Sequence, residues 1–186
     1  MEAAVDGTTP EGRQWYACYT RGRHEKQVER LLGEREFEVF LPLVPRIRQW
    51  HDREKVVEFP LFPSYVFARF DGRDLALAAA VPGLVNIVRF NGRPVAIPEE
   101  EIENIRLLST SLPPAPEDPD LGPWVEEGEV VEIISGPLTA VRGVVAERRG
   151  NRRLIVVVGV AAIDQGLRVE VDRAAVRTLE QGQAAS

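Results

Sequence analysis

Residues able to do nucleophilic or metal chemistry are few in this chain of 186 residues. Cys18 is the single cysteine, and with His24 or His51 it could form a thiol–imidazole pair, the arrangement of a cysteine nucleophile. A cysteine inside an aromatic run such as residues 15–19 more often serves as a small buried hydrophobe. One cysteine and two histidines supply neither a disulfide framework nor a zinc cluster. We therefore expect no metal and no cofactor, and a thiol enzyme remains the minor alternative.

Phosphate-binding and paired-carboxylate patterns are also missing from the sequence. No glycine-rich loop precedes a predicted helix, and no two carboxylates stand in a recognisable acid–base context. Glu99, Glu100 and Glu101 follow Pro98, and they are explained as the first turn of a helix, where acidic side chains favour the helix dipole. The sequence therefore predicts a binding protein and not an enzyme.

Composition and charge are those of a folded protein of one domain or two small ones. Hydrophobic residues make up 44%, charged residues 28%, and the net charge is -6. That net charge argues against wholesale coating of nucleic acid, but residues 13–55 hold ten Lys/Arg against seven Asp/Glu. This basic region is either a small nucleic-acid contact or a solvated surface. With no signal-peptide pattern and no run of the ~18 apolar residues that span a bilayer, we expect a cytoplasmic protein without a membrane partner.

The elements that must position any binding residues fall on two sides of a Pro-rich stretch. In the first part, the patterns predict strands at residues 15–20, 36–41, 64–70 and 84–90 and helices at residues 24–35, 73–80 and from Pro98 onward. Residues 45–59 are predicted to form a protruding hairpin with a basic flank, or else a solvated two-stranded edge. Asn91-Gly92 predicts a second, tight hairpin turn. The order β-α-β-(hairpin)-β-α-β-α is that of a ferredoxin-like α/β sandwich.

The second part has a different character. Five short β runs, at residues 130–134, 143–145, 154–158, 167–171 and 176–179, predict a small five-stranded, SH3-like β-barrel. The fold class is therefore α+β. The predicted divisions are a disordered tail at 1–13, the sandwich at 14–112, a linker at 113–123, the barrel at 124–180 and a tail at 181–186.

The strand at residues 64–70 is the most informative stretch. Its alternation places Val66, Ala68 and Phe70 on one face, which we expect to pack on the sandwich helices. Tyr65 and Phe67 lie on the other face. Two aromatic rings there are either a second buried layer or an exposed patch that a partner covers, and we favour the patch.

The motifs of both parts resemble one protein family. In the first part they are Trp15-Tyr16, His24-Glu25-Lys26, Val39-Phe40-Leu41-Pro42, Pro60-Leu61-Phe62-Pro63-Ser64-Tyr65-Val66-Phe67, Pro82-Gly83-Leu84-Val85 and Pro94-Val95-Ala96-Ile97-Pro98. These residues resemble the N-terminal (NGN) domain of the NusG/RfaH family of transcription elongation factors. The second part resembles the family's KOW domain through Gly128-Glu129-Val130-Val131, Gly136-Pro137-Leu138 and Gly143-Val144-Val145.

Two details qualify the resemblance. Residues 46–50 and 88–92 are closer to the specialised paralogues, RfaH and the UpxY antiterminators, than to housekeeping NusG. Ala140 departs from the KOW pattern, which often has a second glycine at this position, and suggests a slightly different turn.

The resemblance implies binding sites as well as a fold. The N-terminal domain would bind the clamp helices of RNA polymerase through an apolar depression. Its residues would be Tyr65 and Phe67, with Phe62, Pro63, Tyr16 and Phe90 at the margin. The exposed non-template DNA strand would be contacted by Arg21, Arg23, His24 and Lys26, with Arg46 and Arg48 on the hairpin as further candidates. His24 could instead cap its helix.

The expected function is that of a monomeric, operon-specific antiterminator that suppresses pausing and termination. The KOW domain would recruit the termination factor Rho or a small-subunit ribosomal protein, and its β-branched run 154–158 favours a stable barrel over a switch to helix. One alternative is a housekeeping NusG-type factor. The other is a stand-alone RNA-binding module in which Tyr65 and Phe67 stack bases, although the strand lacks that fold's Lys/Arg-Gly-aromatic start.

Overall fold

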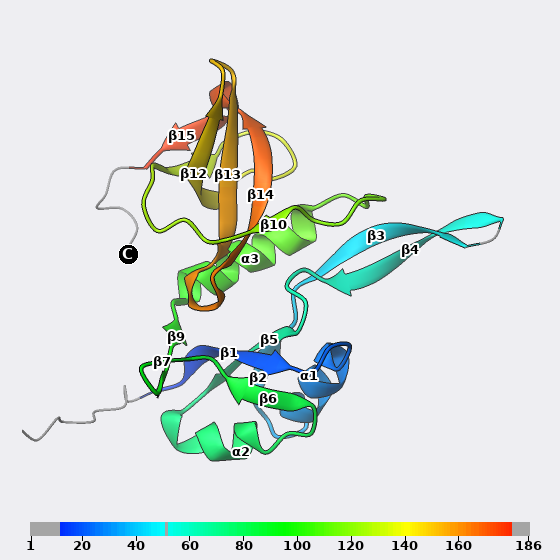
Figure 1. Ribbon diagram of the computed structural model, residues 1–186, viewed down its shortest axis with the longest axis vertical. Coiled ribbons are helices and arrows are strands. Elements are labelled where there is room, and N and C mark those ends of the chain that lie inside the picture. The colour runs from blue at the N-terminus through cyan, green and yellow to red at the C-terminus, as the bar shows by residue number, and fades with distance from the viewer. Residues whose placement is uncertain (1–11, 51, 180–186) are drawn as a thin grey trace, which may run out of the picture. The chain divides into compact units, whose positions relative to one another are not determined.

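The computed structural model describes residues 12–50 and 52–179, which form two compact units. Unit 1 comprises Met1–Leu41 and Ser64–Ala96, and unit 2 comprises Pro42–Pro63 and Ile97–Ser186. Helices and sheets occur in the same chain, so the predicted mixed α/β class is confirmed (Figure 1). The predicted tails fall largely outside the described residues, as does His51.

Unit 1 follows the predicted order of strands and helices. Its elements are β1 (Gln14–Thr20), α1 (Glu25–Gly33), β2 (Glu38–Phe40), β5 (Tyr65–Phe70), the 3-10 turn η1 (Gly72–Asp74), α2 (Leu75–Ala79), β6 (Leu84–Ile87), β7 (Arg89–Phe90) and β8 (Arg93–Pro94). The main sheet has the order β2-β5-β1-β6, and each of these pairs is antiparallel. Strands β7 and β8 form the small hairpin predicted from Asn91-Gly92.

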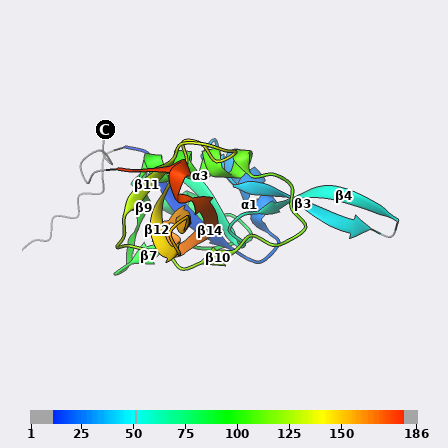
Figure 2. The ribbon, with the colours of Figure 1, turned by 90° about the horizontal axis from the view of Figure 1, so that it is seen from above.

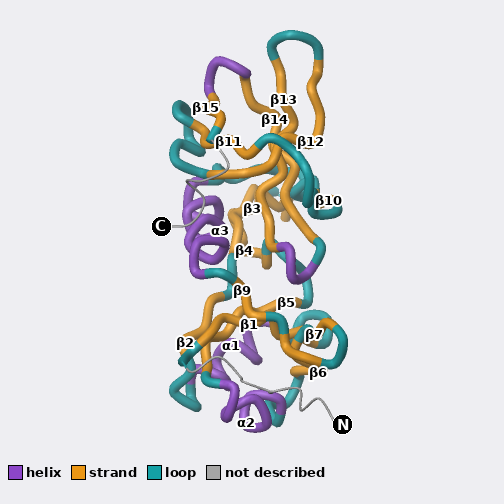
Figure 3. The backbone as a smooth tube through the Cα atoms, turned by 90° about the vertical axis from the view of Figure 1, so that its left-hand side faces the viewer, coloured by secondary structure: helices purple, strands orange, loops and turns teal. Residues whose placement is uncertain are grey.

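The core of unit 1 lies between this sheet and its helices. Helices α1 and α2 lie on one side of the sheet (Figure 3), and Val28 and Leu32, four residues apart on α1, are both fully buried. Val66, Ala68 and Phe70 of β5 are fully buried as well, and the ring of Phe70 stacks on Tyr16 with centroids 4.8 Å apart. The predicted core face of β5 is therefore confirmed.

Unit 2 contains the predicted hairpin and the third helix. Strands β3 (Leu43–Trp50) and β4 (Arg53–Pro60) pair antiparallel along their whole length. After β9 (Ala96–Ile97), helix α3 (Glu99–Ser111) begins behind Pro98 and buries Ile102, Ile105 and Leu108. The hairpin and α3 group with the C-terminal strands, so the two units do not follow the predicted boundary near residues 112–124. That domain boundary stays a prediction.

The C-terminal strands of unit 2 form one antiparallel sheet. They are β10 (Leu121–Gly122), β11 (Val130–Ile133), β12 (Arg142–Arg149), β13 (Arg153–Val160), β14 (Gln165–Asp172) and β15 (Val176–Thr178), with the 3-10 turns η2 (Ala161–Ile163) and η3 (Arg173–Ala175). The pairing order is β10-β14-β13-β12-β11-β15, which confirms the five predicted β runs. Strand β10 was missed because two residues in a Pro-rich stretch show no alternation. Closure of the sheet into a barrel stays a prediction.

Two positions show local backbone constraints, one inside strand β13 and one in the turn between β11 and β12. At Gly159, a Cβ atom would lie 2.2 Å from the carbonyl oxygen of Gln165, so no side chain fits there. Ala140 has a φ of 72°, in the left-handed region that glycine favours, and its N–H donates to the carbonyl oxygen of Ile133 at 2.7 Å. The residue that departs from the family pattern therefore adopts a glycine-like conformation under strain.

Candidate functional site

An aromatic pair on unit 1, formed by Tyr19 and Tyr65, is partly exposed to solvent. The two residues are register partners on β1 and β5, and their ring centroids are 5.4 Å apart with the planes tilted by 54°. Tyr19 is 38% exposed, and Tyr65 is half-buried. Partial burial raises the pKa of the Tyr65 hydroxyl, and the neighbouring Tyr19 raises it further. The pair presents ring surface and hydroxyl groups together, as interface tyrosines commonly do.

Sequence reasoning missed Tyr19. The signal was present, because Trp15, Ala17 and Tyr19 alternate along β1 just as Tyr65, Phe67 and Arg69 alternate along β5. Cross-strand partners share a face, so pairing the two strands would have brought Tyr19 beside Tyr65.

Three of the predicted contact residues lie inside the protein. Phe67 is fully buried and pairs with Phe40 on β2, with ring centroids 6.2 Å apart, so it does not form an exposed floor. Tyr16 is buried on the opposite face of the sheet from Tyr65, against Phe70. Phe62 is fully buried too. The interpretation of these three side chains as surface is corrected. Strand alternation shows that Phe67 shares a face with Tyr65 but not what covers that face, and the roles of Tyr16 and Phe62 were those that the resemblance implies. Pro63 is exposed.

The aromatic pair stands at the end of the sheet where three sequence motifs meet. The N–H of Thr20 donates to the carbonyl oxygen of Ser64 at 2.8 Å, and the N–H of Ser64 donates to the carboxylate of Glu25 at 2.8 Å. Glu25 is only 6% exposed although it is charged. Its carboxylate therefore ties the first turn of α1 to the residue before Tyr65.

The third motif is held by close packing. Gly83 accepts a hydrogen bond from the N–H of Arg21 at 2.9 Å and has a φ of 95°. A Cβ atom at Gly83 would lie 3.0 Å from Nδ1 of His24 and 3.2 Å from Cγ2 of Val28. Only glycine combines this φ with this proximity, which explains the Pro82-Gly83 motif in physical terms.

The predicted DNA-contact residues near α1 differ in exposure. Arg21, Arg23 and Lys26 are exposed, and Arg23 has a φ of 66°, a strained conformation for a side-chain-bearing residue. His24 occupies the N-cap position but makes no side-chain capping bond, and its Nδ1 is buried without a hydrogen-bond partner among the described residues. Three cations are thus available to a ligand at this end of the sheet.

The other predicted contact residues lie on two hairpins. Arg46 and Arg48 of β3 both form ion pairs with Asp118, and the Arg46 side chain is only 11% exposed. In this arrangement Arg46 is not free to contact DNA. Phe90, on the β7–β8 hairpin of unit 1, is 72% exposed. The Asn91-Gly92 turn beside it has positive φ at both residues, as predicted for a two-residue hairpin turn.

A thiol enzyme would require Cys18 to be exposed and reactive, and the structure shows that it is not. Cys18 is fully buried in β1, and burial raises the pKa of its thiol to about 12. A buried, protonated thiol is not a nucleophile, so the thiol-enzyme alternative is wrong. Within residues 12–50 and 52–179, no cluster of three or more His, Cys, Asp or Glu side chains is placed to hold a metal ion.

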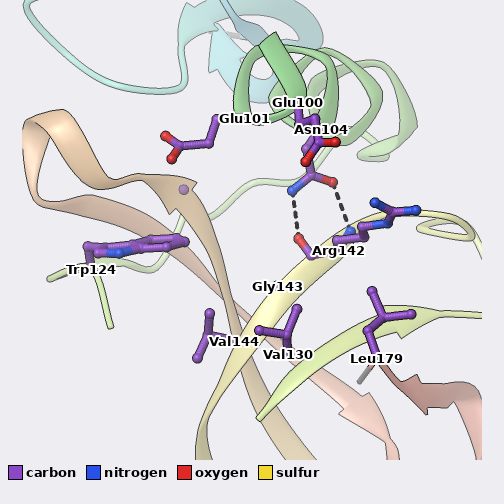
Figure 4. Close-up of a pocket in the computed structure, with 10 residues that line it drawn as sticks. Glu100, Glu101, Asn104, Trp124, Val130, Arg142, Gly143, Val144 and Leu179 are labelled. Carbon is purple, nitrogen blue, oxygen red and sulfur yellow. Dashed lines mark hydrogen bonds between the residues drawn. The ribbon is translucent and has the colours of Figure 1, made fainter. Parts of the chain in front are cut away.

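Unit 2 has a pocket of about 240 Å³ between α3 and the C-terminal strands (Figure 4). Asn104 on α3 reaches Arg142 on β12, where its side-chain amide donates to the backbone carbonyl at 2.6 Å and accepts from the backbone N–H at 2.8 Å. Glu101 accepts a hydrogen bond from the N–H of Ala161 at 3.3 Å, and burial raises its pKa. Asn104 and Glu101 therefore both have structural partners, and Trp124, Val130 and Leu179 supply apolar walls.

The chain belongs to the NusG family, because the model of that family, described as transcription termination factor nusG, matches residues 13–106. A transcription termination/antitermination protein NusG from Thermus thermophilus is 29% identical over 166 residues, covering 78% of this chain and 89% of that protein. The NusG protein of Rickettsia bellii is 27% identical over 158 residues, covering 79% and 80% respectively.

A solved structure described as showing domain interaction in Thermotoga maritima NusG aligns with 90% of this chain and 98% of that one, at 23% identity and a TM-score of 0.46. The family named from the sequence motifs is confirmed by the match to residues 13–106. Among the described residues, no helix has the length and hydrophobicity needed to traverse a bilayer.

Proposed function

We propose that this chain is a transcription elongation factor of the NusG type that binds RNA polymerase through the surface around Tyr19 and Tyr65. The observation that carries the proposal is a partly exposed aromatic pair held on a framework of buried contacts. Exposed aromatic patches mark interaction sites, and interface energy is concentrated in such anchors. Membership in a family of transcription factors supports polymerase as the partner.

The clamp helices of polymerase are the proposed contact. Tyr65 keeps its predicted role there, and Tyr19 joins it. Phe67 supports the pair from the same face of β5 without touching the partner, because its side chain is fully buried. Factors bound in this way would hold the polymerase closed over DNA and reduce pausing and termination.

The rim of the same surface suits the exposed non-template DNA strand. Arg21, Arg23 and Lys26 offer three exposed cations within a few residues of Tyr19. Arginine and lysine at such positions bind phosphates, and arginine also stacks on unpaired bases. His24 is proposed as a positioning residue, since its Nδ1 lies against Gly83.

The remaining features of the family are proposed at their predicted places. The N-terminal domain would span residues 14–112 with the ferredoxin-like arrangement, and residues 113–123 would form the linker. A KOW barrel at residues 124–180 would recruit Rho or a small-subunit ribosomal protein, in the cytoplasm. The hairpins that carry residues 46–50 and 88–92 favour a specialised, operon-specific antiterminator over a housekeeping factor, and transcript profiles after deletion would show one affected operon or many.

The polymerase contact is tested by capture of core RNA polymerase on the immobilised full-length chain. Replacing both Tyr19 and Tyr65 by Ala should weaken capture about tenfold or more, because paired aromatic anchors dominate interface energy. Val85→Ala is the matched control, since Val85 is an exposed apolar residue on β6 of the same unit, 53% exposed. A folded double variant with unchanged capture would contradict the proposal. Unchanged capture together with lost RNA binding would instead support the RNA-binding module.

A further inference from the structure

The pocket between α3 and the C-terminal strands of unit 2 has largely apolar walls. Val130, Val144 and Leu179 line one side of it, and the half-buried ring of Trp124 lies at one end (Figure 4). The N–H of Trp124 donates to the carboxylate of Asp164 at 3.2 Å, which anchors this segment. The tip of the β3–β4 hairpin lies away from the other elements of unit 2 (Figure 2), so it does not cover the pocket.

The size of the pocket limits what it can hold. Its volume of about 240 Å³ is below the roughly 300–1,000 Å³ of sites for drug-sized ligands. The pocket therefore suits a small molecule or one side chain of a partner.

A half-buried carboxylate, that of Glu101, belongs to this apolar lining. Its Oε2 accepts the hydrogen bond from Ala161, and among the described residues no cationic side chain forms an ion pair with it. Burial raises the pKa of Glu101 more than this hydrogen bond lowers it, so the negative charge is incompletely compensated. Glu100 also lines the pocket, and within the described part of the chain it has no ion pair either.

The surroundings of Glu101 do not supply the missing positive charge. Arg142 lines the pocket, but its guanidinium donates to Glu132 at 3.2 Å. The helix dipole favours acidic residues in the first turn of α3, but Glu99 and Glu100 satisfy that preference while exposed to solvent. The dipole therefore does not explain why a third carboxylate lies in an apolar pocket, where an unpaired charge is costly.

We propose that this pocket binds a small organic cation, an ammonium or guanidinium group carried on a short apolar chain, with Glu101 as its counter-ion. Trp124 lies at the same end of the pocket as Glu101 (Figure 4), so the cation also packs against the indole ring. The apolar chain extends along Val130 and Val144. Free amines and the lysine or arginine side chains of a partner share this chemistry. The inference goes beyond the proposed polymerase contact in unit 1, and its test needs no polymerase.

The experiment is an NMR titration of the isotope-labelled, full-length chain with butylammonium. The backbone amides of Gly143 and Gly159 and the indole N–H of Trp124 report on the pocket, because these residues line it. We expect saturable shifts at these three positions, with a dissociation constant in the millimolar range, since so small a ligand makes few contacts. The matched neutral probe is n-butanol, which has the same chain length and should bind about tenfold or more weakly.

Three variants separate charge from apolar packing. Glu101→Gln should weaken butylammonium binding about tenfold or more and change n-butanol binding less than twofold, because the amide oxygen can still accept from Ala161. Glu99→Gln is the matched control, since it removes an exposed carboxylate of the same helical turn, and should change either probe less than twofold. Trp124→Leu keeps an apolar side chain without the ring, and should weaken butylammonium binding about threefold or more.

A Gly-Lys-Gly peptide with blocked ends distinguishes the two sources of the cation. Tighter binding of the peptide than of butylammonium assigns the site to a side chain of a protein partner, and equal or weaker binding assigns it to a free amine. Equal binding of n-butanol and butylammonium would overturn the proposal, as would unchanged butylammonium binding in Glu101→Gln or Trp124→Leu, or shifts confined to residues outside the pocket. Circular dichroism of each variant confirms that it is folded.

Discussion

The end of the unit 1 sheet and the β3–β4 hairpin both present aromatic and basic side chains, but they are built in opposite ways. Around Tyr19 and Tyr65, the supporting groups are buried: the Glu25 carboxylate binds a backbone N–H, and Gly83 lies against His24. On the hairpin, the supporting carboxylate is exposed: Asp118, 70% exposed, pairs with the largely buried Arg46 and with Arg48, which is 43% exposed. The first arrangement is fixed by packing and the second by charge.

Because of this difference, we expect the two surfaces to respond differently to the removal of a side-chain group and to a rise in salt concentration. Buried hydrogen bonds and close packing resist salt but tolerate no loss of a group, because an unsatisfied buried donor or a clash is costly. Exposed ion pairs lose little when a partner is removed and weaken as salt rises. A preformed surface suits docking of a folded partner, whereas a labile one suits a ligand that must compete for its place.

The largest effect is expected at Gly83. Gly83→Ala should destabilise the protein by about 2–4 kcal/mol, because an L residue at a φ of 95° costs energy and its Cβ would contact His24 and Val28. Urea denaturation measures this difference. Gly92→Ala is the matched control: its φ is 80°, but no atom lies within 4 Å of the added Cβ. Its cost should be about 1 kcal/mol, and equal costs for both variants would show that packing at Gly83 contributes nothing.

The next effect concerns the buried carboxylate. Glu25→Ala should cost about 1–3 kcal/mol, because the N–H of Ser64 loses its acceptor, while Glu25→Gln should cost less since an amide oxygen can still accept. Raising the salt concentration should leave both values nearly unchanged. Glu34→Ala, which breaks only the exposed pair with Arg30, should cost less than about 0.5 kcal/mol. If the loss of stability in Glu25→Ala depended strongly on salt, the end of the sheet would be held by screened charges, as the hairpin is, and the proposed difference between the two regions would be wrong.

A smaller effect of opposite sign is expected at Ala140. Ala140→Gly should stabilise the protein by about 0.5–1 kcal/mol, since relief of left-handed strain at a φ of 72° exceeds the entropy that glycine adds to the unfolded chain. Thermal unfolding checks this prediction. Ala76→Gly, in the exposed part of α2, should instead destabilise by about 1 kcal/mol. A lower melting temperature for Ala140→Gly would show that the turn is not strained.

The smallest effect on stability is expected at Asp118. Asp118→Asn should change the free energy of unfolding by less than about 0.5 kcal/mol at low salt, and by still less at high salt, because the Asp118 carboxylate is 70% exposed to solvent. Paired denaturation curves at the two salt concentrations measure this. A cost comparable to that of Glu25→Ala would mean that the hairpin is fixed as firmly as the end of the sheet.

Local patterns predicted the elements of the fold but not all of its surfaces. Alternation identified β5 and its two faces correctly, yet it placed Phe67 at the surface, because coverage of a face depends on residues far away in the chain. The apolar stripe of α1 and the acidic first turn of α3 were readable because both obey local rules. The two-residue strand β10 left no periodic signal.

The site was predictable only where its residues stood in motifs. His24-Glu25-Lys26 and Pro63-Ser64-Tyr65 were recognised separately, but the Glu25–Ser64 hydrogen bond that joins them follows from strand pairing. The ion pair between Arg46 and Asp118 joins residues 72 positions apart in the sequence, and no local pattern near either residue predicts it. Tyr19 was overlooked because its position beside Tyr65 follows from the pairing of β1 with β5 and not from its own neighbours in the sequence.

The route of the chain between β2 and β5 has an evolutionary consequence. These two strands are direct neighbours, with Phe40 opposite Phe67, yet the chain leaves unit 1 after Leu41 and returns at Ser64. The entropy of closing such an excursion grows only slowly with its length. The intervening hairpin can therefore lengthen, shorten or exchange its residues among descendants while the aromatic pair and its framework stay intact, so new ligand preferences can be acquired there without rebuilding the rest.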